Sequence, residues 1–190
     1  TILGDGRAGL IVGMDATIDA SGTADEPIVF TSSQPEGTRE RGDWAGLVLL
    51  GDAPINVEGG TKHVEGVDED PRAIYGGDDP EAYCGKLTYV RVEFAGFDLK
   101  QDKELNGLTL GGCGSDTYIR HVQVHRGLDD GIEVFGGTVD LKYAVISLAR
   151  DDSLDWDLGW QGRVQHLIIQ QDPDEGDNGM ETDNNGGSMD

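Results

Sequence analysis

Acidic residues recur at fixed positions in the second half of the chain, and they are the residues there with the clearest chemistry. The pairs Asp129-Asp130 and Asp151-Asp152 are 22 residues apart, and Asp177-Asn178 follows after another 26. Asp outnumbers Glu by 25 to 12. Short carboxylate side chains, together with the carbonyl groups of Gly-rich turns, provide the hard oxygen ligands that Ca²⁺ prefers.

If these segments stack as repeats, their carboxylates form a ladder with a rung spacing of roughly 5 Å. At that distance like charges destabilise one another unless solvent, a bound cation or a raised pKa relieves them. We therefore expect Ca²⁺ or a similar hard cation to be bound by Asp130, Glu133, Asp152, Asp155, Asp157, Glu181 and Asp183. The alternative is a solvated acidic face, as in an adaptation to a salty habitat.

The elements that position these acids are themselves repeated. Related phrases begin at Asn106 (N-G-L-T-L-G-G), Asp130 (D-G-I-E-V-F-G-G), Asp152 (D-S-L-D-W-D-L-G) and Asn178 (N-G-M-E-T-D-N-N). They place one apolar column at intervals of 24, 22 and 26 residues, made of Leu108, Ile132, Leu154 and Met180. Leu10 and Leu47 extend the column towards the N-terminus. Periods of this length identify a repeat architecture.

A second repeated segment lies between these phrases. It begins at Leu87, Ile119, Leu141 and Val164, and the four copies align without gaps. Val90, Val122, Ala144 and Leu167 share one column, and Tyr89, His121, Tyr143 and His166 share another. Apolar alternation with period two and β-branched residues indicate strands. Two or three short strands per period of 22–26 residues predict an all-β fold, a right-handed parallel β-helix. The rings of the second column are expected to stack rather than to bind a ligand.

Composition limits the possible partners. The net charge is −23, with 37 acidic residues against 14 basic ones, which argues against nucleic-acid binding and predicts repulsion of polyanions and anionic membranes. No stretch is long and apolar enough to predict a membrane span. Glycine, at 30 residues, is common enough to supply a tight corner in every coil.

The 190 residues are expected to form one β-helix domain, as a fragment or processed part of a longer chain. Two polar insertions interrupt the repeat, at residues 55–83 and 97–104. The first is Gly-, Asp- and Glu-rich and is expected to protrude, either as a functional loop or as a tolerated decoration. We expect self-association through the coil ends, because open strand edges readily pair with another chain.

The two cysteines are predicted to form a disulfide. Cys84 opens one strand, and Cys113 ends the corner before the equivalent strand of the next coil. Neighbouring coils lie about 4.8 Å apart, a separation that a disulfide can bridge. Two buried free thiols are the alternative. A disulfide would indicate maturation in an oxidising, extracytoplasmic compartment.

Several sequence motifs relate the chain to a known group of proteins. T-A-D-E-P-I-V-F-T-S (23–32), G-D-W-A-G-L-V-L-L-G (42–51), D-D-G-I-E-V-F-G-G-T-V (129–139) and D-D-S-L-D-W-D-L-G (151–159) are among them. With them the chain resembles bacterial secreted or surface-anchored right-handed parallel β-helix proteins, many of which are lipoproteins. The resemblance implies the fold and a secreted or cell-surface location, and it carries no established activity.

Three functions remain open at this point. The chain lacks a G-x-S-x-G nucleophile motif, a phosphate-binding loop and a dinucleotide motif. We therefore favour a non-enzymatic extracellular structural or adhesive protein that assembles into a filament or surface array. A carbohydrate-active lyase or hydrolase using the acidic face is the alternative, with Arg126 and Arg150 near the Asp pairs. A carbohydrate-binding module, with Trp44 or Trp160 stacking on sugar rings, is the third.

Overall fold

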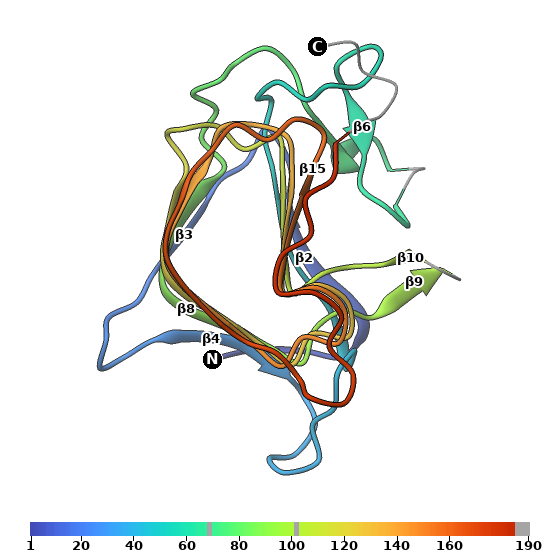
Figure 1. The fold of residues 1–190 in the computed structure, drawn as a ribbon, viewed down its shortest axis with the longest axis vertical. Coiled ribbons are helices and arrows are strands. Elements are labelled where there is room, and N and C mark those ends of the chain that lie inside the picture. The colour runs from blue at the N-terminus through green and yellow to red at the C-terminus, as the bar shows by residue number, and fades with distance from the viewer. Residues whose placement is uncertain (68–69, 101–102, 185–190) are drawn as a thin grey trace.

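The computed structural model describes residues 1–67, 70–100 and 103–184, and it shows a parallel β-helix. Figure 1 looks along the stacked coils, which superimpose into one outline bounded by two sheets. Among the described residues the only helical segment is a single 3₁₀ turn, η1 (Pro71–Ala73). The predicted fold class is therefore confirmed.

The strands fall into two large parallel sheets and two small hairpins. Sheet A contains β1 (Ile2–Gly4), β3 (Ile18–Ser21), β4 (Ile28–Ser32), β8 (Gly85–Glu93), β12 (Tyr118–His125), β14 (Asp140–Ser147) and β16 (Val164–Gln170). Sheet B contains β2 (Gly6–Val12), β5 (Trp44–Leu50), β11 (Leu108–Gly111), β13 (Ile132–Phe135) and β15 (Leu154–Asp157). The antiparallel hairpins are β6 (Lys62–His63) with β7 (Ile74–Tyr75) and β9 (Asp98–Lys100) with β10 (Lys103–Glu104).

The core column of sheet B has the predicted register. Leu47, Leu108, Ile132 and Leu154 pair in succession and are fully buried. A parallel bridge from Leu154 to Met180 continues the column into the next coil. Its two end members are exposed, Leu10 to 39% and Met180 to 55%, because each has a neighbouring coil on one side only.

The core column of sheet A is also confirmed. Val90, Val122 and Ala144 pair in register and are at most 3% exposed, and Leu167 packs against them at the C-terminal end. The two columns face each other across the interior, and they form one continuous apolar core with the disulfide. Burial of these side chains, at about 25 cal/mol per Å² of apolar surface, is the main force stacking the coils.

Each long strand of sheet A bends at a residue with left-handed backbone. Tyr89, His121, Tyr143 and His166 have φ between 49° and 62° and occupy equivalent positions in β8, β12, β14 and β16. The bend inserts one extra outward residue, so that both Ile119 before it and Val122 after it point into the core. A second such column at the end of the strands contains Phe94, Arg126 and Leu148, with φ of 60°, 56° and 58°.

Left-handed backbone is unfavourable for a side chain with a Cβ atom, which predicts a stabilising substitution. Arg126→Gly is expected to raise the free energy of unfolding by about 1 kcal/mol, because Gly adopts this conformation without steric cost. Arg126 is exposed, and its backbone N–H bond to Ser147 O would be kept. Urea denaturation measures the change. Arg150→Gly is the control, since Arg150 is exposed in the next coil without a positive φ, and it should destabilise.

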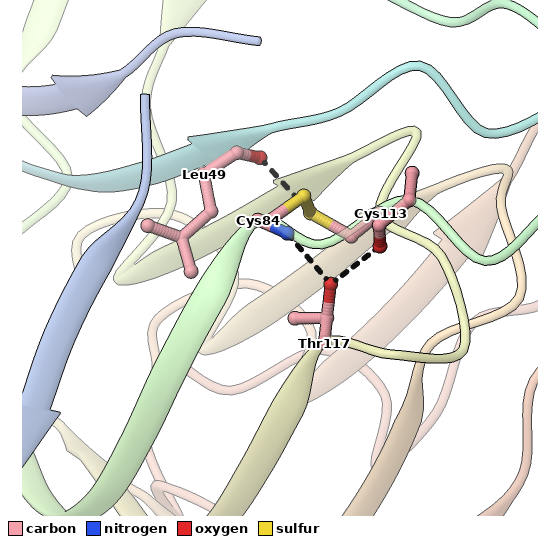
Figure 2. The surroundings of a disulfide bond; sticks show 5 residues. Leu49, Cys84, Cys113 and Thr117 are labelled. Carbon is pink, nitrogen blue, oxygen red and sulfur yellow. Dashed lines mark hydrogen bonds between the residues drawn. A yellow bond between two sulfur atoms is a disulfide. The ribbon is translucent and has the colours of Figure 1, made fainter. Parts of the chain in front are cut away.

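The predicted disulfide is present. Cys84 at the start of β8 is bonded to Cys113 in the corner after β11, with their Cα atoms 5.7 Å apart. Figure 2 shows Thr117 below the bond, where its Oγ1 accepts from Cys84 N at 2.9 Å and donates to Ala82 O at 3.0 Å. Both cysteines are at most 1% exposed.

The insertion at 55–83 packs onto the solenoid, whereas the sequence predicted a protruding loop. Its apolar residues Ile55, Val64, Ala73 and Tyr75 are buried on the outer face of sheet B. With Val48, Leu50, Leu105 and Leu158 they form a second hydrophobic core. In Figure 1 the β6 hairpin and the β9–β10 hairpin both lie on the sheet B side of the coils. The outer face of this sheet is therefore partly covered.

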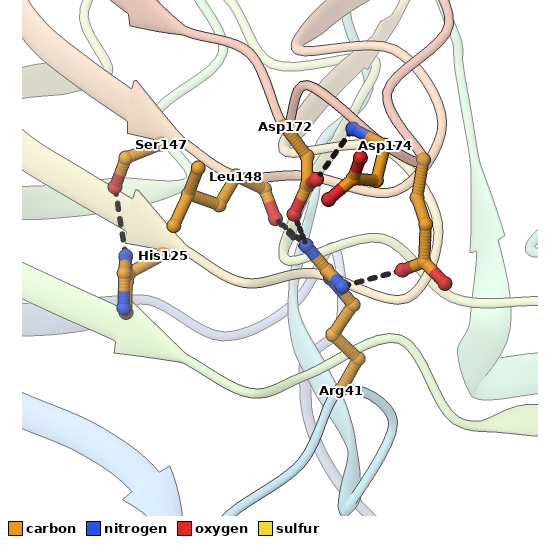
Figure 3. A network of polar contacts seen from close by, with 7 residues as sticks. Arg41, His125, Ser147, Leu148, Asp172 and Asp174 are labelled. Atoms are coloured by element: carbon orange, nitrogen blue, oxygen red, sulfur yellow. Dashed lines mark hydrogen bonds and ion pairs between the residues drawn. The ribbon is translucent and has the colours of Figure 1, made fainter.

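The loop at 34–43 connects the second coil to the last one. Arg41 donates from Nε and Nη2 to Leu148 O, at 3.2 and 2.9 Å. Its guanidinium also pairs with Asp172 at 2.5 Å and with Glu175 at 2.6 Å (Figure 3). Only 14% of the Arg41 side chain is exposed. A single residue thus fixes the corner of β14 and the turn after β16 to a loop more than a hundred residues earlier.

Candidate functional site

The acidic corner lies where the chain enters each strand of sheet B. Asn106, Asp130, Asp152 and Asn178 occupy the same position in four successive coils. Backbone hydrogen bonds join neighbouring coils at this position: Gly107 N donates to Asp130 O and Gly131 N donates to Asp152 O, both at 2.9 Å. Side chains reinforce the stack: Asp130 Oδ1 accepts from Asp152 N at 2.9 Å, and Asp152 Oδ1 accepts from Asn178 N at 2.6 Å. Both aspartates of this column are therefore used to join coils.

Three carboxylates, which we call the carboxylate cluster, meet beside this column. Asp130, Glu133 and Asp155 each offer an oxygen within 4.8 Å of the other two. Asp130 and Asp155 are buried, with 8% and 7% exposed, and Glu133 is half-buried. Glu133 and Asp155 are register partners on β13 and β15, as the sequence predicted, and their carboxyl groups are in hydrogen-bond contact.

The electrostatics of the cluster are unfavourable for three free carboxylates. Burial, together with the neighbouring charges of Asp129 and Asp155, raises the pKa of Asp130 to about 9. Burial and the charge of Asp130 raise the pKa of Glu133 well above its usual value, and burial also raises that of Asp155. In the absence of a cation the cluster therefore retains protons at neutral pH.

Two oxygen atoms at this site are buried without a hydrogen-bond partner among the described residues. They are Asn106 Oδ1, on a residue 3% exposed, and Asp155 Oδ1. The amide nitrogen of Asn106 is engaged, because it donates to Glu133 Oε2 and to Thr109 Oγ1, the latter at 3.3 Å. Leaving a buried oxygen unpaired costs roughly 1–3 kcal/mol. Three carboxylates, one of them with an unpartnered oxygen, and an unpartnered amide oxygen are a donor set that fits a hard cation.

The other predicted ligands lie elsewhere. Asp152 belongs to a second, more exposed group with Asp151 and Asp177. Asp157 accepts from Leu158 N at 2.5 Å, and neither it nor Asp183 lies in a carboxylate group of the described residues. Exposed Glu181 contacts Asp152, and this contact raises its pKa to about 7. Of the predicted ligands, Asp130, Glu133 and Asp155 therefore form one group of three within the described residues, and Glu181 and Asp152 make a separate contact.

Sequence reasoning did not single out Asn106 as a candidate ligand. The signal was available, since Asn106 shares a column with Asp130 and Asp152 in the aligned repeats. The predicted ligands were all carboxylates, and the amide oxygen of Asn106 was therefore not among them.

Two further polar features lie on sheet A. The rings of Tyr89, His121, Tyr143 and His166 form the predicted stack, with centroids 4.4, 4.6 and 4.7 Å apart. Further along the strands, His125 Nδ1 lies 2.9 Å from Ser147 Oγ (Figure 3), and burial lowers the pKa of His125. Glu93 on the neighbouring rung is engaged by Thr31 and Arg91. Ser147 is only 7% exposed, which argues against a nucleophilic role.

Comparison with known families agrees with this architecture. The family model of the pectate-lyase like beta helix domain matches residues 4–190. The chain belongs to this family. No characterised protein and no solved structure matches the chain significantly. Membership of the family therefore shows that this chain has the pectate-lyase-like β-helix fold, and it does not specify an activity.

The family membership and the parallel sheets confirm the β-helix fold that the resemblance implied. Over the part of the chain that the structure describes, no helix has the length and apolar character needed to cross a bilayer.

Proposed function

We propose that this pectate-lyase-like β-helix is a non-catalytic structural or adhesive element outside the cell, stabilised by Ca²⁺ or a similar hard cation at the acidic corner. The observation that carries the proposal is the carboxylate cluster with its two unpartnered oxygen atoms. Together with Asn106 the cluster draws on three successive coils, so an ion there would join the coils of β11, β13 and β15. The disulfide supports an oxidising compartment.

Four residues would hold the cation: Asn106, Asp130, Glu133 and Asp155. A bound ion supplies positive charge that offsets the repulsion of the carboxylates and satisfies the free oxygens. The protein supplies the positioning, because the bond from Asp152 N orients Asp130 and the Asn106 amide orients Glu133. Burial of Asp130 and Asp155 leaves little of the cluster accessible to a polymer, which favours a structural ion over a catalytic one.

The test is the thermal stability of the chelator-stripped protein as Ca²⁺ is added. An ion that binds only the folded state stabilises it by about 2.7 kcal/mol at a hundred times its Kd. For a chain of this size the melting temperature should rise by roughly 5–10 °C. Differential scanning calorimetry with Ca²⁺ and with EDTA measures the shift.

Matched variants make the test specific. Glu133→Gln should remove most of the Ca²⁺-dependent shift, whereas Asp183→Asn removes one acid outside the cluster and should keep it. Equal melting temperatures in Ca²⁺ and EDTA would contradict the proposal, and so would an equal loss of the shift in both variants.

Self-association is the second part of the proposal. The outer sides of the first and last coils expose apolar side chains, Leu3 to 58%, Ile168 to 63% and Met180 to 55%. They also carry strand edges that can pair with a further parallel strand. End-to-end contact between copies would be heterologous and would therefore produce a filament. Sedimentation velocity with Ca²⁺ present should show concentration-dependent growth, and a monodisperse monomer at high concentration would contradict this part.

A carbohydrate-active enzyme or binding module is the second candidate, and the family description favours it. Turnover of a neutral or acidic polysaccharide that disappears in Asp155→Asn, with the fold intact, would establish the enzyme. Absence of turnover across such substrates is the result expected of a structural element.

A further inference from the structure

The outer face of sheet A carries a groove whose chemistry differs from that of the rest of the molecule. The groove has a volume of about 580 Å³ and crosses β12, β14 and β16 near their N-terminal ends. We call it the basic groove. Its charged lining consists of Arg120, Lys142 and Arg163 together with Asp116 and Asp140, and Tyr118 lies among them.

Cations gather here in register. Arg120 pairs with Lys142 across β12 and β14, and Lys86 of β8 pairs with Tyr118. Lys86 and Arg120 both lie over the Tyr118 ring, at 5.7 and 4.4 Å from its centroid, and Lys142 lies 5.2 Å from the Tyr143 centroid.

Three of these cations have no acidic partner. Within the described ranges Lys86, Arg120 and Lys142 form no ion pair, whereas Arg163 is paired with Asp140 at 2.6 Å. In a chain with 37 acidic and 14 basic residues, three neighbouring cations that form no ion pair, although Asp116 lines the same groove, are not explained by internal pairing. The net charge of −23 predicted repulsion of polyanions, but it does not describe this face.

The position of the groove restricts what it can bind. It crosses the face of a sheet, where the backbone groups of β12 and β14 are already used between strands, so an added peptide strand could pair only at its end, along β16. Recognition must come from side chains. The surrounding acidity disfavours a nucleic-acid duplex or an anionic bilayer, because each presents a broad anionic surface to the whole face rather than to the groove alone. A slender, hydroxyl-rich polymer with spaced anionic groups meets these conditions.

We infer that the basic groove binds a glycan that carries sulfate or phosphate monoesters. A guanidinium and two ammonium groups offer donors in several directions, which suit the three terminal oxygens of a tetrahedral ester better than a planar carboxylate. The coils repeat every 4.8 Å or so, and a polymer lying along the solenoid axis therefore meets cations on successive rungs. This inference rests on the proposed adhesive role and names the partner for adhesion.

A second groove continues this face beside the aromatic stack. Its volume is about 530 Å³, and its lining includes Tyr89, His121, Gln123, Tyr143 and Ile168. The stacked rings cover one another's faces, so they present edges to this groove rather than platforms for sugar stacking. Charge, rather than ring stacking, is therefore the expected source of affinity.

The test compares dextran sulfate, phosphorylated dextran, carboxymethyl dextran and neutral dextran, so that only the anionic group varies. In biolayer interferometry at low ionic strength, the sulfated or the phosphorylated polymer should bind, and added salt should weaken binding. Arg120→Gln/Lys142→Gln should lower the affinity by about tenfold or more. Arg7→Gln/Arg150→Gln removes the same charge from exposed positions outside the groove and should change affinity by less than about twofold.

Each other outcome overturns the inference. An equal loss in both double variants would show general charge attraction only. Equal binding of neutral dextran would exclude recognition of the anion, and equal binding of carboxymethyl dextran would exclude the tetrahedral ester. Glu133→Gln leaves the groove unchanged and should bind like the unaltered protein. The two experiments therefore distinguish a failure of the proposed cation site from a failure of the proposed glycan site.

Discussion

The double variant Cys84→Ala/Cys113→Ala is expected to lose roughly 3.5 kcal/mol of unfolding free energy. The disulfide closes a loop between residues 29 apart, and the crosslink removes many conformations from the unfolded chain. For a protein of this size the melting temperature should fall by roughly 7–14 °C. Alanine is preferred to serine, because both positions are buried and a hydroxyl there would lack water.

Thr117→Val provides the comparison at the same place. It removes the non-covalent link from Cys84 N to Ala82 O and keeps the disulfide. It should cost about 1–3 kcal/mol and remain sensitive to a reducing agent. The double Ala variant should be insensitive to reductant. A melting temperature of the unaltered protein that does not respond to full reduction would contradict the assigned role of the crosslink.

Much of the fold could be predicted from the sequence, because in a β-helix residues at equivalent positions of successive repeats lie next to each other in space. Residues such as Leu108 and Ile132, one repeat apart, become neighbours in register. The same logic placed Cys84 beside Cys113 and Tyr89 beside His121. Periodicity determines which side chains stack and leaves undetermined how far each column is buried.

The contacts that could not be predicted lie outside the repeat. The 55–83 insertion has few apolar residues, and its polar composition concealed that Tyr75 and Val64 cover sheet B. The carboxylate cluster was only partly predicted, because the repeat pattern does not show which acids converge: Glu133 and Asp155 meet Asp130, whereas Asp157 and Asp183 do not. Overall charge likewise concealed the basic groove, since a chain-wide sum gives no information about one face.

The contacts of Arg41 with the last coil have no counterpart in the repeat pattern, so the sequence contained no indication of them. Arg41→Met is expected to lower the free energy of unfolding by roughly 3 kcal/mol. The substitution keeps much of the side chain's apolar volume, but it removes two hydrogen bonds to Leu148 O. It also leaves Asp172 and Glu175 close together without their shared cation.

The Arg41 variant should also change where the protein first opens. Arg41 joins a loop beside β5 to the last coil, so its loss should expose the backbone amides of β16 and residues 171–178 to hydrogen exchange before those of β11 and β13. Arg72→Met is the matched control, because Arg72 also pairs with an aspartate, Asp70, but its side chain is 87% exposed. Exposed pairs contribute little, so this variant should be close to the unaltered protein in stability and exchange. If Arg41→Met and Arg72→Met behave alike, or if exchange in the last coil is unchanged, Arg41 does not hold the C-terminal coil in place.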